Sequence, residues 1–113
     1  CFVNEGTRLP MMFMDDAIRA TLELMDAPLN SLNYHSNYNL SSMSFSAKEL
    51  ADEISSHVDF ECTYKPDYRQ DIANTWPISI DDEAARNDWK WEPKFDITKM
   101  TEEMITNLRR LNE

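Results

Sequence analysis

The spacing of hydrophobic positions near the start of the chain predicts a strand followed by a helix. The apolar run at residues 9–14 has strand length, and Pro10 favours a strand edge or start because proline has no N–H group to donate. Beyond this run, the apolar side chains follow the spacing of one helix face: Ile18, Leu22 and Met25. We expect this helix over residues 16–27, since Pro28 pushes the residue before it out of helical geometry.

A second helix is predicted from its capping residues. Ser46 and Glu49 have the Ser-x-x-Glu spacing, in which each side chain accepts a hydrogen bond from the other residue's backbone N–H group. The helix should begin there and end near Val58. Short strands are predicted on both sides of it, at residues 38–42 and 60–64, the second because its residues alternate and favour β structure.

The last third of the chain is predicted to be an irregular arm followed by two helices. Residues 67–80 show no regular pattern. The aspartate pair at 81–82 can cap a short helix that ends within residues 89–93, and Thr98 or Thr101 begins the final helix. The order β-α-β-α-β, arm, α-α predicts the α/β fold class and one domain.

The net charge and the glycine content exclude several functions. A net charge of −10 repels nucleic acid and anionic membranes, so neither is an expected partner. One glycine in 113 residues leaves no glycine-rich loop for a pyrophosphate, so no cofactor-binding residue is expected here. No apolar run is long enough for a transmembrane helix, and the first residues lack the order of a signal peptide.

Neither a metal site nor an acid–base pair is expected. His57 and Cys62 are metal-ligand types, but they lack two more ligands at a diagnostic spacing. Cys1 and Cys62 are too few for a disulfide framework, which favours a reducing compartment. The aspartate pairs at 15–16 and 81–82 stand where a helix start favours negative charge, so we interpret both pairs as caps.

Two separated motifs resemble the extended short-chain dehydrogenase/reductase family, also called the NAD-dependent epimerase/dehydratase family. The first is Leu-Pro-Met-Met-Phe-Met-Asp-Asp at residues 9–16, followed by Ile-Arg-Ala-Thr. The second runs from Arg69 through Thr-Trp-Pro at 75–77 to Trp-Glu-Pro-Lys-Phe-Asp at 91–96. Within the family, the Pro-Met-Met-aromatic sequence and the Thr-Trp-Pro tripeptide are similar to the L-threonine 3-dehydrogenase branch.

The resemblance implies that residues 1–113 are the C-terminal substrate-binding lobe and final strands and helices of an extended Rossmann-type enzyme. It further implies NAD-dependent oxidation of L-threonine to 2-amino-3-oxobutanoate, with NAD bound by an N-terminal half that is absent here. The family uses a Tyr-x-x-x-Lys pair, yet none of the four tyrosines has a lysine four residues later. We therefore expect no catalytic residue in this sequence and no dehydrogenase activity from it alone.

The same resemblance nominates residues that would contact the substrate. A hydroxyl and a small apolar wall suit the polar head and the methyl group of threonine, and a tryptophan in the arm could close over them. The candidates are Thr7, Leu9, Pro10, Met11 and Trp76. Arg69 matches an arginine that grips phosphates in nucleotide-sugar epimerases; here we expect it to form an ion pair or another polar contact.

Alternatives and partners also follow from the resemblance. A nucleotide-sugar epimerase or dehydratase lobe and a non-catalytic binding module remain open as other functions. The expected partners are L-threonine, the rest of the parent chain and, in the full-length enzyme, a second copy in a homodimer. The implied location is the mitochondrial matrix for a eukaryotic protein and the cytoplasm for a bacterial one.

Overall fold

A computed structural model describes residues 1–111 of the chain. The elements, in order, are β1 (Arg8–Met11), α1 (Met14–Asp26), the short 3-10 helix η1 (Leu29–Ser31), β2 (Met43–Ser46), α2 (Ala47–His57), α3 (Tyr68–Ala73), α4 (Glu83–Trp89) and α5 (Ile97–Leu111).

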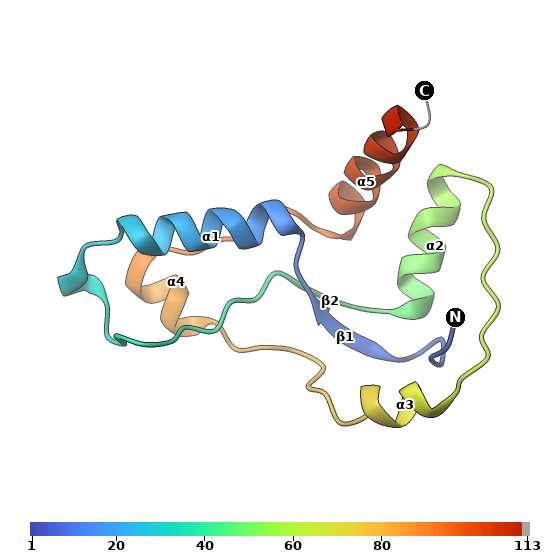
Figure 1. Cartoon of the computed structure of the whole chain (residues 1–113), viewed down its shortest axis with the longest axis horizontal. Helices are drawn as coiled ribbons and strands as arrows, with labels where there is room; N and C mark the ends of the chain where they lie inside the picture. Colours follow the sequence, from blue (N-terminus) through green and yellow to red (C-terminus); the bar gives the residue numbers. More distant parts are fainter. Residues whose placement is uncertain (112–113) are drawn as a thin grey trace.

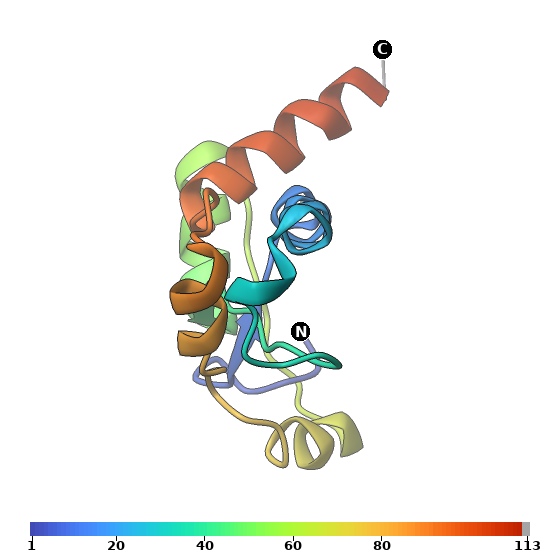
Figure 2. The ribbon, with the colours of Figure 1, turned by 90° about the vertical axis from the view of Figure 1, so that its left-hand side faces the viewer.

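The described chain is flat and open (Figures 1 and 2). It measures 50 × 38 × 18 Å, and its radius of gyration is 16.8 Å. A compact domain of this length would have a radius of gyration of about 13 Å. In Figure 1, α1 and α4 lie at one end of the central strands, α2 and α5 lie at the other end, and α3 lies near the N-terminus. Much apolar surface is therefore left open.

The two strands form an antiparallel pair in the middle of the chain. Leu9 lies opposite the buried Phe45, and Pro10 lies opposite Ser44. Each strand has only one neighbour among the described residues, so a proline without an N–H group is tolerated in β1.

The capping box predicted at the start of the second helix is confirmed. The Ser46 hydroxyl accepts a hydrogen bond from the Glu49 N–H group at 3.1 Å, and the Ser46 N–H group donates to Glu49 Oε2 at 2.8 Å. The short helix α4 ends at Trp89 as expected. Lys90 then takes a left-handed φ of 64°, and the Trp91 N–H group donates to the Ala85 carbonyl at 3.3 Å.

Several predicted element positions were wrong. Residues 38–42 are not a strand; the strand lies directly after them, at Met43–Ser46. Residues 60–64 pair with no strand of the described chain, and two of their carbonyls accept bonds from the Ser55 hydroxyl and the Cys1 amino group. The first strand ends at Met11, three residues early. The arm is not wholly irregular, because it contains α3.

The interpretation of the first aspartate pair as caps was also wrong. Phe13 is the N-cap residue of α1 and makes no side-chain capping bond, which places Asp15 and Asp16 inside the first turn. In the second pair, Asp81 Oδ1 accepts from the Glu83 N–H group at 3.0 Å, whereas Asp82 at the N-cap position makes no capping bond.

The core lies between α1 and α4 and does not include the strongest apolar face of α1. Its fully buried members are Ala20, Ala85 and Trp91. The residues that we call the α1 stripe are exposed instead: Met14, Ile18, Leu22 and Met25. No helix of the described residues is long and apolar enough to cross a membrane.

Candidate functional site

Thr7 lies at a junction between the N-terminal turn and α3. Its hydroxyl donates to Gln70 Oε1 at 3.0 Å, and the Asn4 N–H group donates to the same oxygen at 2.6 Å. Gln70 is buried, and its amide nitrogen donates to Asn74 Oδ1 at 2.7 Å. The sequence analysis missed Gln70, because a lone glutamine in a region predicted to be irregular gives no pattern to recognise.

The three candidate residues of β1 do not share one face of the strand. Side chains alternate along a strand, so Leu9 and Met11 point to one side and Pro10 points to the other. Leu9 and Pro10 are half-buried, while Met11 is 41% exposed. Any substrate contact made by β1 therefore involves one of these faces or the end of the strand.

Met11 lines an apolar groove between the strands, α2 and α5. The groove has a volume of about 580 Å³. Its lining is almost wholly apolar: Met11, Met12, Phe45, Leu50, Ile54, Val58, Met100, Thr101, Met104, Ile105, Leu108 and Arg109. Leu9, Pro10, Thr7 and Trp76 are not part of this lining.

Arg69 is held by two neighbours. Its guanidinium forms an ion pair with Asp67 at 2.6 Å and lies 3.6 Å from the centroid of the Phe2 ring. The hydrogen bonds from the Arg69 side chain and backbone lower the pKa of Asp67 to about 2. The guanidinium fork is thus already occupied by a carboxylate.

Trp76 lies in the arm between α3 and α4 and is 58% exposed. The backbone N–H group of Trp76 donates to the Ala73 carbonyl at 3.1 Å. Two residues later, the Ile78 carbonyl accepts a hydrogen bond from the Ser44 hydroxyl of β2. Since Ser44 pairs with Pro10, the arm lies beside the strands on which the other candidates stand.

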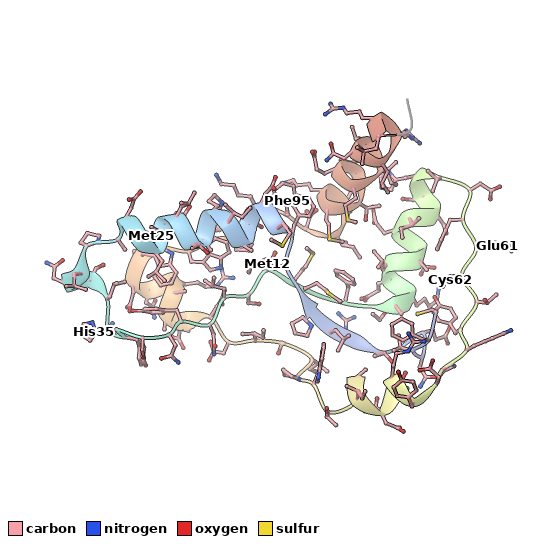
Figure 3. All side chains as sticks on the ribbon, in the orientation of Figure 1. Met12, Met25, His35, Glu61, Cys62 and Phe95 are labelled. Carbon is pink, nitrogen blue, oxygen red and sulfur yellow. The ribbon has the colours of Figure 1, made fainter. Side chains whose placement is uncertain are left out.

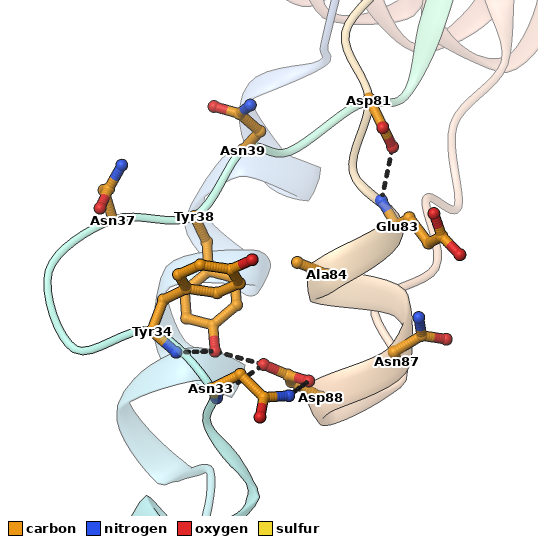
Figure 4. A pocket seen from close by; sticks show the side chains of 10 residues that line it. All are labelled: Asn33, Tyr34, Asn37, Tyr38, Asn39, Asp81, Glu83, Ala84, Asn87 and Asp88. Carbon is orange, nitrogen blue, oxygen red and sulfur yellow. Dashed lines mark hydrogen bonds between the residues drawn. The ribbon is translucent and has the colours of Figure 1, made fainter.

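A polar pocket of about 560 Å³ lies away from these candidates, between the loop after η1 and α4 (Figure 4). Asp88 accepts bonds from the Tyr38 hydroxyl, from the Asn33 N–H group at 2.9 Å and from the Asn33 amide at 2.6 Å. The bonds from Tyr38 and Asn33 lower the pKa of Asp88, while partial burial and Asp88 raise the pKa of Tyr38. These groups satisfy one another and hold the loop on α4.

Comparisons with known proteins show which proteins this chain resembles. No protein-family model matches it. The mitochondrial L-threonine 3-dehydrogenase of Sus scrofa is 46% identical over 107 residues, which are 93% of this chain and 28% of that protein. A solved structure of a monomeric L-threonine 3-dehydrogenase from a metagenome, in the apo form, is 86% identical with a TM-score of 0.95; the match covers 100% of this chain and 37% of that one.

This chain is homologous to a C-terminal portion of the L-threonine 3-dehydrogenases. The expected fold class, an α/β portion of a Rossmann-type enzyme, is confirmed by the same structural match. An uncharacterized epimerase/dehydratase of Staphylococcus aureus (strain MRSA252) is also similar, at 42% identity over 106 residues, which are 92% of this chain and 33% of that protein. The chain spans about a third of the length of these relatives.

The first of the two motifs that carry the resemblance meets the end of the second around Asp16. The buried Asp16 carboxylate accepts bonds from the Lys94 N–H group at 3.0 Å and the Phe95 N–H group at 3.0 Å. It also pairs with Arg19 at 2.8 Å, and the Arg19 guanidinium lies 4.7 Å from the Trp91 ring centroid. Asp16 of the acidic pair thus joins the start of α1 to the Trp-x-Pro-x-Phe sequence.

Aromatic packing adds to the contacts between the start of α1 and residues 91–95. The ring of Phe95 lies 4.5 Å from that of Phe13, and Figure 3 shows Phe95 beside the start of α1. The Trp91 Nε1 group donates to the Ser41 carbonyl at 3.1 Å. The following Asp96 accepts a bond from the Lys99 N–H group at 2.9 Å, so the motif ends where α5 begins.

Residues 1–111 contain no cluster of three or more side chains suited to a metal ion. His57 pairs with Glu53 at 2.8 Å, and Cys62 lies on the segment after α2.

Proposed function

We propose that residues 1–113 form the substrate-side portion of an NAD-dependent L-threonine 3-dehydrogenase, which oxidises L-threonine to 2-amino-3-oxobutanoate. The observation that carries this proposal is the 86% identity, over the whole chain, to a protein named as that enzyme. In this reaction NAD accepts a hydride from C3 of threonine. Gly6, the single glycine, lies in the turn before β1 and not at a helix start, so the described residues offer no pyrophosphate cradle. We assign NAD binding to the rest of the parent chain.

Within this portion, we assign the substrate contacts to the region where the arm passes the strands. Support comes from the bond between Ser44 and the Ile78 carbonyl, which keeps the arm carrying Trp76 beside Pro10. Thr7 stands just before the same strand, and Leu9 and Met11 lie on its other face, so we assign them contacts from that face. We assign Arg69 a structural role, because Asp67 and Phe2 already hold its guanidinium.

The direct test measures NADH formation from L-threonine and NAD by the parent protein and by the isolated 113-residue chain. We expect activity from the parent only, because the Tyr-x-x-x-Lys pair and the glycine-rich loop are missing from this sequence. NADH formation by the isolated chain would contradict the assignment of the catalytic groups. A well-folded parent without threonine-dependent activity would contradict the proposed function.

An epimerase or dehydratase acting on a nucleotide-sugar is the second candidate. It is favoured by the 42% identity to the epimerase/dehydratase of S. aureus. The occupied guanidinium of Arg69 speaks against it, since a phosphate would have to displace Asp67. The same parent preparation, assayed with nucleotide-sugars, separates the two. A parent mass no larger than that of 113 residues would favour the non-catalytic binding module.

We propose that the parent protein is a monomer. The 86% identical relative is named as monomeric, which favours a monomer over the homodimer expected from the resemblance. The Sus scrofa relative is mitochondrial. We therefore keep the mitochondrial matrix as the proposed location if the source is eukaryotic, and the cytoplasm if it is bacterial.

A further inference from the structure

Helix α1 has a buried face and an exposed apolar face on opposite sides. A helix turns about 100° per residue, which places Asp16 and Ala20 together on the side that packs on α4 and residues 91–95. The α1 stripe lies on the reverse side. Its members are exposed by more than half: Met14 64%, Ile18 54%, Leu22 56% and Met25 75%.

The α1 stripe is the most regular apolar surface of this helix, and an isolated solvent-facing surface helix does not carry such a row. Apolar side chains gather at helical spacing where a helix meets another surface. The described residues supply that surface only to the opposite face. Methionine at both ends adds side chains that adapt to an irregular neighbour.

One edge of the α1 stripe is acidic. The helical turn places Asp15 and Asp26 on the same side of the helix, about three turns apart along the axis and about 100° to 120° around it from Met14, and both are exposed. The other edge carries Ala17 and Thr21, which are uncharged. A surface that covers the stripe is therefore expected to be apolar and to carry basic groups along one side only.

We propose that the α1 stripe is a docking surface for the remainder of the parent polypeptide, which covers it with an apolar patch flanked on one side by lysine or arginine. The inference rests on the proposed function, since it needs a parent longer than this chain. The relatives support that length, because this chain spans 28% of one and 37% of another. The covering segment belongs to the same molecule, consistent with the proposed monomer.

Thiol labelling of the parent protein tests the docking. Leu22→Cys places a thiol in the α1 stripe, and Leu29→Cys places one at a residue that is 72% exposed, just beyond the helix. Labelled peptides are separated from those of Cys1 and Cys62 by mass spectrometry. We expect the thiol of Leu22→Cys to react at least about tenfold more slowly than that of Leu29→Cys, because a covered site reacts only on local opening. Equal rates would overturn the proposal.

Carbodiimide coupling identifies what covers the stripe. We expect Asp15 or Asp26 to couple to lysines in parent peptides outside these 113 residues, with a yield independent of protein concentration. Coupling only between molecules, rising with concentration, would overturn the proposal in favour of a second copy. Threonine oxidation is measured on the same preparations. An inactive parent with a protected stripe would contradict the proposed function alone. An active parent with a freely reactive stripe would contradict this inference alone.

Discussion

Asp16 joins two parts of the chain that are far apart in sequence. Its wholly buried carboxylate accepts from the backbone of residues 94 and 95 and pairs with Arg19. A buried carboxylate is stable only when its oxygens are bonded in this way. Asp15, one residue earlier in the same helical turn, is exposed. The two halves of the aspartate pair therefore have different roles.

Replacing Asp16 should destabilise the parent protein strongly. Asp16→Ala leaves the Lys94 and Phe95 N–H groups without acceptors and Arg19 with less counter-charge, so we expect the free energy of unfolding to fall by about 3 kcal/mol. The matched control is Asp15→Ala, which should cost about 0.3–1 kcal/mol through the helix dipole. Chemical denaturation measures both. Equal losses would mean that the Asp16 bonds contribute little.

Asp67 should show an acid-dependent ion pair with Arg69. The pKa of Asp67 in the folded chain is about 2, below its ordinary value of about 3.9. Because the folded pKa is the lower one, the ion pair stabilises the fold above about pH 4, and this contribution is lost as the pH falls toward 2. In Arg69→Ala the Asp67 midpoint, followed by NMR of the carboxyl carbon, should rise toward its ordinary value. An unchanged midpoint would exclude Arg69 as the cause.

Trp76 gives the sharpest residue-level test of the proposed substrate side. Its side chain is exposed and takes no part in the described core, so removing it should spare the fold. In the parent enzyme, Trp76→Ala should lower kcat/KM for L-threonine by about tenfold, the loss of one apolar contact of about 1.4 kcal/mol. Tyr68→Ala, at an aromatic on α3 that is 73% exposed, is the control. The same kcat/KM in both variants would exclude Trp76 from the pocket.

At the scale of the element, α2 is the case where local chemistry decides the structure. The capping box needs only Ser46 and Glu49, which are three residues apart, so the sequence alone predicts it. Ser46→Ala should lower the free energy of unfolding of the parent by about 1 kcal/mol, because one helical N–H group loses its acceptor. Ser56→Ala, at an exposed position near the end of α2, should change it by less than about 0.5 kcal/mol. Denaturation midpoints at equal slopes compare the two variants.

The strands show where sequence patterns were insufficient. Residues 60–64 alternate and favour β structure, yet a strand also needs a partner strand, and no strand of the described residues pairs with them. Local propensity contains no information about that partner. The strand near residue 40 was predicted too early for the same reason, because pairing with β1 selects Met43–Ser46.

The candidate site was predictable only as a region. The resemblance nominated residues of β1 and of the arm, and the Ser44 bond to the Ile78 carbonyl keeps the arm beside the strands. Their contact with a substrate stays a prediction. Which side of β1 each residue occupies follows from register and not from the motif. The bonds from Thr7 and Asn4 to Gln70 could not be foreseen, since they join residues more than sixty positions apart.

At the scale of the molecule, the flat shape and the α1 stripe have one explanation. A chain of 113 residues with 42% apolar side chains could bury a modest core, yet this one leaves an entire helix face exposed and has an expanded radius of gyration. The same residues within a protein about three times as long would have that face covered. The isolated chain is therefore expected to bind hydrophobic dyes and to self-associate.

A single substitution in the α1 stripe should then act in opposite directions in the two settings. In the isolated chain Leu22 is more than half exposed, so Leu22→Asp removes apolar surface from solvent and should reduce dye binding and self-association. In the parent, the same change should lower the free energy of unfolding by at least about 2 kcal/mol, because leucine burial is lost and a charge is placed in an apolar contact. Leu29→Asp, outside the stripe, should leave the parent within about 0.5 kcal/mol. A parent that tolerates both substitutions equally would show that Leu22 faces solvent there too.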